Sequence, residues 1–205
     1  MDVALSDARA PATGLRAGRW GLHFYRKSVE SLDSIFMLVR QLTALDSAAY
    51  QTLRLQGLEE CPTAFSSSYT EEAGRSPVEI ARRVTPAADG SRCVFAAFVD
   101  ERMAGILAII RPERAKLRHS AELAGMYVAP EFRRRGLGGA LVDRAIAHAR
   151  SLVGVRQLKL NVIAANLPAR TLYKSRGFIC VGVEPEAICV DGRYFDEELY
   201  ILRLN

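Results

Sequence analysis

A glycine-rich turn between an expected strand and an expected helix is the feature that most constrains this chain. Its residues, in order, are Arg133, Arg134, Arg135, Gly136, Leu137, Gly138 and Gly139. Glycines let the backbone approach a ligand closely, and the first N–H groups of a helix have no intrahelical acceptor. Because the helix dipole also favours negative charge at this end, the turn predicts a site for an anionic, phosphate-bearing cofactor.

The composition is typical of one soluble globular domain. The chain has 205 residues, of which 49% are hydrophobic and 25% charged, and this length suits a single core. Residues 1–20 lack apolar periodicity and predict a disordered tail, so the domain is expected over 21–205. No apolar run approaches the roughly 20 residues that cross a bilayer, and none is typical of a signal peptide. We therefore expect a cytoplasmic protein that does not bind membranes.

The cysteines and the basic residues argue against two further classes of protein, metal-binding proteins and nucleic-acid-binding proteins. Cys61, Cys93, Cys180 and Cys189 are scattered without a C-x-x-C pair, which predicts buried free thiols and no metal site. The net charge is +5, and we assign most arginines to the solvated surface, apart from those of the turn, whose planar guanidinium groups suit phosphate. A nucleic-acid-binding protein needs a basic stripe or stacking aromatics, and only Phe132 hints at one. No nucleic-acid partner is expected.

Apolar periodicity along the chain predicts an α/β fold. The segment 61–70 has the composition of a loop. Helices are expected at 47–58 after an Asp46 N-cap, at 77–84, at 139–152, and at 168–175 where Gly177 ends the helix. Strands are expected at 36–43, 93–99, 103–111, 122–128 and 155–163, with two more in 178–204 around the hairpin dipeptide Asp191-Gly192.

Two motifs identify a family. The turn does not fit the dinucleotide pattern G-x-G-x-x-G, because Leu141 occupies the position of the third glycine. The sequence RRRGLG at 133–138 instead matches Q/R-x-x-G-x-G/A, and NLPARTLYKSRGF at 166–178 matches N-x-x-A-x-x-L-Y-x-x-x-G-F. Together with the strand at 125–130, these motifs make residues 35–204 resemble the GCN5-related N-acetyltransferase (GNAT) superfamily.

The resemblance implies both a fold and a cofactor. The fold is a central mixed, mostly antiparallel sheet of six to seven strands flanked by about four helices, in which a bulge splays the strand at 122–128 from the strand at 155–163. The co-substrate is acetyl-CoA, and no metal is implied. Its pyrophosphate would bind backbone N–H groups of the turn, and Asn166 would bind the pantetheine or cap its own helix. The implied cofactor-binding residues are Met126, Tyr127, Val128, Arg133, Arg134, Arg135, Gly136, Leu137, Gly138, Gly139, Asn166 and Tyr173.

Two residues are candidates for proton transfer, again by resemblance. Tyr173 stands where family members use a tyrosine to protonate the departing thiolate, and we expect its phenol near its ordinary pKa. Glu122, eleven positions before Arg133, stands where the histone-acetylating branch has its base. A base is needed because an unperturbed lysine-like amine has a pKa of about 10.4. The alternatives are a packing aromatic for Tyr173 and a surface carboxylate for Glu122.

The acceptor side is less constrained. The expected activity is direct acetyl transfer to a primary amine of a small molecule, peptide or protein, and the alternative is a non-catalytic acyl-CoA-binding sensor or interaction module. The apolar final strand could pair across a two-fold axis to form a homodimer. The candidates for the acceptor wall are Phe65, Ser67, Ser68, Tyr69, Tyr194 and Asp196, and the alternative for each is a solvated loop residue. A carboxylate such as Glu71, Glu72 or Asp196 could attract an ammonium group.

Overall fold

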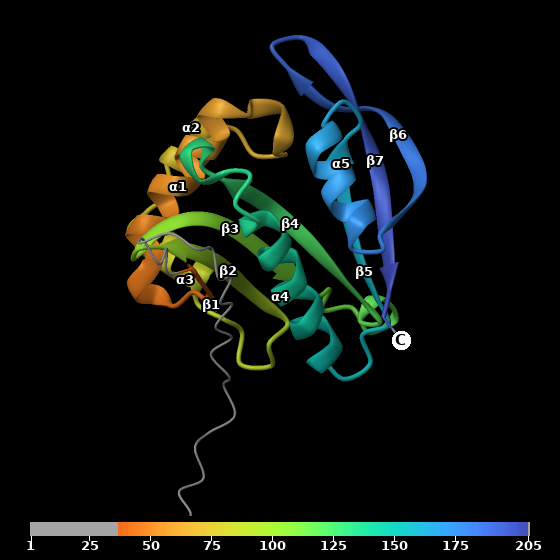
Figure 1. Cartoon of the computed structure of the whole chain (residues 1–205), viewed down its shortest axis with the longest axis horizontal. Coiled ribbons are helices and arrows are strands. Elements are labelled where there is room, and N and C mark those ends of the chain that lie inside the picture. The colour runs from red at the N-terminus through yellow and green to blue at the C-terminus, as the bar shows by residue number, and fades with distance from the viewer. Residues whose placement is uncertain (1–36, 205) are drawn as a thin grey trace, which may run out of the picture.

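A mixed seven-stranded sheet forms the centre of the molecule (Figure 1). The computed structural model describes residues 37–204, so the predicted tail at 1–20 and the start of the first predicted strand lie outside the described residues. The strands are β1 (Met37–Gln41), β2 (Arg92–Val99), β3 (Arg102–Ile110), β4 (Ser120–Val128), β5 (Gln157–Ile163), β6 (Ile179–Val190) and β7 (Arg193–Arg203). Their order is β1-β2-β3-β4-β5-β7-β6, and only β4 and β5 run parallel. The predicted mixed, mostly antiparallel sheet is confirmed.

Five α-helices accompany the sheet within residues 37–204: α1 (Ser47–Glu60), α2 (Tyr69–Ala73), α3 (Pro77–Val84), α4 (Leu137–Ser151) and α5 (Leu167–Ser175). The sequence did not predict α2, because five residues are too few to show helical periodicity. A capping box starts it: the Glu71 N–H donates to the Ser68 hydroxyl at 3.2 Å, and the Ser68 N–H donates to the Glu71 carboxylate at 2.7 Å. Helix α4 begins two residues earlier than predicted, so Gly138 lies in its first turn.

Helices α1 and α4 cover opposite faces of the sheet. A Cβ atom on Gly105 of β3 would lie 3.2 Å from Leu141 of α4. A Cβ atom on Gly57 of α1 would lie 2.9 Å from the ring of Tyr127, which β4 directs to the other face. The central strands are therefore buried on both sides, as the apolar runs of β2 and β3 require. The predicted apolar face of α4 is buried against the sheet.

A bulge in β4 and its separation from β5 shape the middle of the sheet. Ile106 and Ala108 of β3 pair with Tyr127 and Ala124 of β4, so β4 carries one extra residue between these pairs. Gly125 lies there with a φ of 62°, a left-handed conformation that suits glycine. Parallel pairing between β4 and β5 covers only residues 120–122 and 157–159. The predicted splayed strand pair is thus present.

The C-terminal hairpin completes the sheet and corrects one prediction. Cys180 and Cys189 on β6 are exposed, so the expectation of buried thiols is wrong for them; Cys93 is buried, with its Sγ 3.6 Å from Nε2 of His148.

Among the described residues, no helix is long and apolar enough to span a membrane. Residues 37–204 also contain no group of three His, Cys, Asp or Glu side chains that could hold a metal ion.

Asp46 links β1 to the start of α1. It occupies the predicted N-cap position of α1, but its side chain does not cap that helix. Instead its carboxylate accepts hydrogen bonds from the Arg40 guanidinium at 2.9 and 2.7 Å and from the Thr43 N–H at 2.8 Å. The hydrogen bonds from Arg40 lower the pKa of Asp46 to about 2.

We expect Asp46→Asn to lower the free energy of unfolding by about 1 kcal/mol at neutral pH, because the pair is bidentate but partly exposed. Because the pKa of Asp46 is lower in the folded state than in the unfolded state, the ionised carboxylate stabilises the folded state fully above the unfolded-state pKa of about 3.9. This stabilisation is lost as the pH falls toward the folded-state pKa. Urea unfolding should therefore show a difference between wild type and variant near pH 7 that shrinks below about pH 3. Glu59→Gln, at an exposed position of α1, is the control, and a difference independent of pH would contradict this assignment.

Candidate active site

A groove opens where β4 and β5 diverge. Its volume is about 580 Å³, and its walls are the bulged part of β4, the loop between β4 and α4, and α5. The groove brings together most of the residues predicted to bind the cofactor, whereas Arg135 and Gly139 lie outside its lining. Those that line it are Met126, Tyr127, Val128, Arg133, Arg134, Gly136, Leu137, Gly138, Asn166 and Tyr173.

The loop before α4 presents backbone N–H groups to the groove. Residues 133 and 134 form a turn, and the N–H groups of residues 136–139 have no hydrogen-bond acceptor among the described residues. Gly136 has a φ of 84°, and a Cβ atom there would find no heavy atom within 4 Å. The positive end of the α4 dipole adds to these unpaired donors. The loop can therefore bind an anion through its backbone.

The first arginine of the loop is held by other partners. The Arg133 guanidinium donates hydrogen bonds to Glu60 at 2.5 Å and to the Val128 carbonyl at 2.9 Å. The Tyr127 hydroxyl donates to the same Glu60 carboxylate at 2.5 Å. These contacts fasten the loop to the end of α1. The geometry favours a positioning role for the Arg133 side chain and leaves anion binding to the backbone.

The other two loop arginines are exposed. Arg134 lines the groove and has a φ of 60°, a conformation uncommon outside glycine. The guanidinium carbon of Arg135 lies 5.6 Å from the centroid of the Phe132 ring. Of the three arginines expected to face phosphates, Arg134 is the one that lines the groove without a described side-chain partner.

The ends of flexible side chains lie close to the other two glycines of the turn. A Cβ atom on Gly138 would lie 2.9 Å from Cε of Met126. On Gly139 it would overlap the guanidinium of Arg176, on the side away from the groove. Leu137, buried to 2% exposure, anchors this first turn of α4 in the core. The start of the helix is thereby held close to the bulge.

Tyr173 lies on the α5 side of the groove. It is buried, its hydroxyl donates to Sδ of Met126 at 3.2 Å, and its ring packs edge-on against Phe178. Burial raises the pKa of the Tyr173 phenol, so the expectation of an ordinary pKa is wrong. The phenol remains protonated at neutral pH and can donate a proton to a group bound beside Met126.

Asn166 takes the second of its two predicted roles. Its Oδ1 accepts a hydrogen bond from the Ala169 N–H at 3.1 Å and caps α5. The residue also lines the groove. Its cap fixes the direction of the helix that carries Tyr173.

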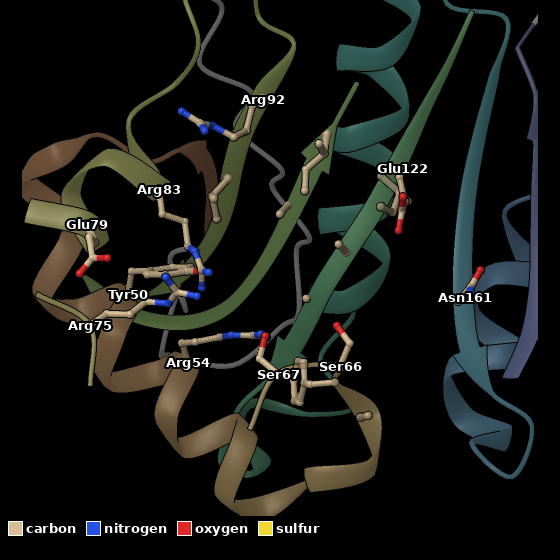
Figure 2. Close-up of a pocket in the computed structure, with 18 of the residues that line it drawn as sticks. Tyr50, Arg54, Ser66, Ser67, Arg75, Glu79, Arg83, Arg92, Glu122 and Asn161 are labelled. Carbon is tan, nitrogen blue, oxygen red and sulfur yellow. The ribbon is translucent and has the colours of Figure 1, made fainter. Parts of the chain in front are cut away.

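A second cavity lies on the face of the sheet that α1 and α3 cover (Figure 2). Its volume is about 610 Å³. It shares several lining residues with the groove, among them Phe65, Gly125 and Asn161. The two spaces therefore meet at the bulge, and a molecule in the cavity can reach one in the groove.

Glu122, the predicted base, lines the second cavity and not the groove. It is exposed, and it is the last residue of β4 that pairs with β5, opposite Lys159. Figure 2 shows Glu122 and Asn161 on the two strands that border the opening. Glu122 and Tyr173 thus lie on different sides of the place where the two spaces meet.

The predicted acceptor wall is present in part. Phe65 and Ser67 line the second cavity. Ser68 instead caps α2, and the side chains of Tyr69 and Tyr194 are exposed at 45% and 62%. Only the centre of the predicted loop segment therefore walls the cavity.

The three carboxylates expected to attract an ammonium group lie outside the cavity lining. Glu71 is used in the α2 capping box, and Asp196 accepts a hydrogen bond from the Glu186 N–H at 3.0 Å. Glu72 is fully buried and pairs with arginines. The structure gives these carboxylates structural partners in place of a substrate.

Arginines line the second cavity at positions that sequence reasoning assigned to the solvated surface. One of them, Arg54, is only 7% exposed. It stands one turn after Tyr50 and one turn before Leu58, both buried on the same helix face. This helical spacing to two apolar residues is the sequence signal from which the burial of Arg54 could have been predicted. The arginines of the lining are Arg54, Arg75, Arg82, Arg83 and Arg92.

Comparison with known sequences gives a family match and a partial relative. The chain matches the model of the acetyltransferase (GNAT) family over residues 58–178, more than half of its length. It is 31% identical over 88 residues to the spermidine N(1)-acetyltransferase of Vibrio cholerae. That match covers 42% of this chain and 50% of the relative, so the chain spans half the length of this curated relative.

Solved structures share the fold. A putative acetyltransferase from Salmonella typhimurium, solved with its cofactor acetyl-CoA, has a TM-score of 0.70 at 20% identity, covering 82% of this chain and 94% of that chain. The ribosomal-protein-alanine N-acetyltransferase from Brucella melitensis has a TM-score of 0.66 at 24% identity, covering 82% and 99%. At these identities the likeness concerns the fold.

Proposed function

Because the chain belongs to the acetyltransferase (GNAT) family, which uses acetyl-CoA, we propose that it transfers an acetyl group from acetyl-CoA directly to a primary amine. The observation that carries this proposal is the groove between β4 and β5, which has unpaired N–H groups at one end and the buried Tyr173 hydroxyl beside the bulge. The relatives above are named for different acceptors, spermidine in one case and a ribosomal protein in the other. Family membership therefore leaves the acceptor open.

The residues of the groove fit acetyl-CoA. Pyrophosphate is an anion that unpaired N–H groups at a helix start can bind, and the open space at Gly136 leaves room for it. On the edge of β4 that faces the diverged strand, beyond Glu122, backbone groups such as the Val128 N–H have no partner on β5, so they are available to the amides of the pantetheine arm. When bound, the thioester supplies the acetyl group.

Three groups of this chain would carry the transfer. A backbone N–H near Val128 polarises the thioester carbonyl and stabilises the negative charge that develops on its oxygen. Glu122, on the acceptor side, takes a proton from the ammonium group, directly or through water. Tyr173, whose phenol is protonated at neutral pH, donates its proton to the departing sulfur.

Replacement of Gly136 tests the backbone cradle. We expect Gly136→Ala to weaken coenzyme A binding about tenfold, because a side chain makes the left-handed backbone cost roughly 1–2 kcal/mol. Isothermal titration calorimetry with coenzyme A measures the change. The matched control is Gly192→Ala in the β6–β7 turn, where φ is 74° and a Cβ atom is equally free of contacts. Similar losses in both variants, or none in Gly136→Ala, would refute the cradle.

Replacement of Tyr173 tests the proton transfer. We expect Tyr173→Phe to lower kcat by about a hundredfold or more while the Kd for coenzyme A changes little, because only the proton donor is removed. Thiol release from acetyl-CoA reports turnover. Tyr194→Phe, at an exposed position of the hairpin, should leave kcat unchanged. A Tyr173→Phe enzyme with normal turnover would remove the tyrosine from the mechanism, and coenzyme A binding with no turnover of any amine would favour an acyl-CoA sensor.

A further inference from the structure

Positive charge is concentrated on one wall of the second cavity. Figure 2 shows Arg54, Arg75 and Arg83 gathered around Tyr50, while Glu122 lies on the other side of the cavity. These arginines come from α1, the turn before α3, and α3 itself. Sequence segments that are far apart thus converge on one place.

Arg54 is a buried charge with two nitrogen atoms that lack a hydrogen-bond partner. Its Nε and Nη1 atoms are inaccessible to solvent and have no hydrogen-bond partner among the described residues. Its guanidinium carbon lies 4.4 Å from the centroid of the Phe65 ring, and burial lowers the pKa of the group. A buried, unsatisfied guanidinium is costly to a fold. Such a cost is expected at a functional site, where a ligand can offset it by pairing with the remaining nitrogen, Nη2.

The carboxylate nearest to this wall is already shared. Oε2 of Glu72 accepts from Arg83 at 2.6 Å and from Arg75 at 3.0 Å. One buried carboxylate therefore faces three guanidinium groups, which leaves an excess of positive charge. Glu79 also lines the cavity, but its carboxylate accepts hydrogen bonds from Ser76 in the capping box of α3.

Arg54 also lies next to the place where transfer would occur. A Cβ atom on Gly125 would be 3.3 Å from Nη1 of Arg54. Gly125 is the bulge residue that lines both the cavity and the groove. An anion held by Arg54 would thus lie beside the bulge, where the cavity meets the groove proposed for acetyl-CoA.

We propose, resting on the acetyltransferase function above, that the acceptor carries a carboxylate or phosphate group in addition to its amine, and that Arg54 binds this anion together with Arg75 and Arg83. A guanidinium fork matches the oxygen geometry of both anions. The amine of the same molecule would lie toward Glu122, on the other side of the cavity from these arginines. A polycation would meet repulsion from the arginine wall.

Matched acceptor pairs test this inference. The panel contains amino acids, each beside its carboxamide, and phosphoethanolamine beside ethanolamine, with spermidine as the polycation. Thiol release from acetyl-CoA gives kcat/KM, and thermal stabilisation of the coenzyme A complex gives binding without turnover. We expect at least one member with a carboxylate or phosphate to exceed its twin without that anion by about tenfold or more in kcat/KM, and to stabilise the complex when the twin does not.

Substitution of Arg54 identifies the group responsible. Arg54→Met, which keeps the length of the side chain, should abolish the preference for the anionic member while leaving coenzyme A binding unchanged. Because it removes an unsatisfied buried charge, its Tm should equal or exceed that of wild type, a result that a purely structural arginine would not give. Arg54→Lys is the second variant and should recover part of the preference. Arg150→Gln, at an exposed position of α4, is the control and should behave as wild type.

The outcomes separate this inference from the proposed function. If spermidine or the twins without the anion serve as well as the members that carry a carboxylate or phosphate, or if no such member reacts or stabilises the complex, the inference is overturned. Acetylation of spermidine alone would leave the proposed function standing. An Arg54→Met enzyme that keeps the anionic preference would also overturn the inference. A protein that binds no coenzyme A would overturn both.

Discussion

Hydrogen bonding between β4 and β5 stops at Glu122, and the strands then separate around a bulge at Gly125. A sheet with both faces covered normally pairs such central strands along their length, so the separation removes ladder hydrogen bonds in the middle of the fold. What it leaves is a set of backbone groups that face open space on the edge of β4. The groove and the second cavity both depend on this opening, because they share Gly125 and Asn161 as lining residues.

The layers around the sheet give the two sides of the opening different chemistry. On one side, the start of α4 supplies unpaired N–H groups and α5 supplies the buried Tyr173 hydroxyl. On the other side, α1 and α3 supply guanidinium groups around a single shared carboxylate. Helices on opposite faces of a bulged strand can therefore bring a phosphate-bearing donor and a separately recognised acceptor to one point. The proposed roles of Tyr173 and Glu122 follow from this division.

Much of the fold could be predicted because its signals are local. Apolar runs, the hairpin dipeptide Asp191-Gly192 and helix-ending glycines such as Gly177 predicted the strands of the sheet and four of its helices. The turn at 133–139 predicted the start of α4 to within two residues. The loop contacts could not be predicted in this way. Arg133 pairs with Glu60, and Tyr127 donates to the same carboxylate, across more than 60 residues of sequence. Arg54 was missed for a different reason: its helical spacing was readable, but an arginine is usually assigned to the surface.

The central claim is that the opening between β4 and β5 receives acetyl-CoA through the backbone of this chain. Amide NMR of the ¹⁵N-labelled protein during titration with coenzyme A tests it most directly, because each backbone N–H reports its own hydrogen bonding. We expect the largest shifts at residues 134–139 and 126–128, with little change in the β6–β7 turn. Shifts confined to other parts of the chain, or none at saturating coenzyme A, would contradict the account.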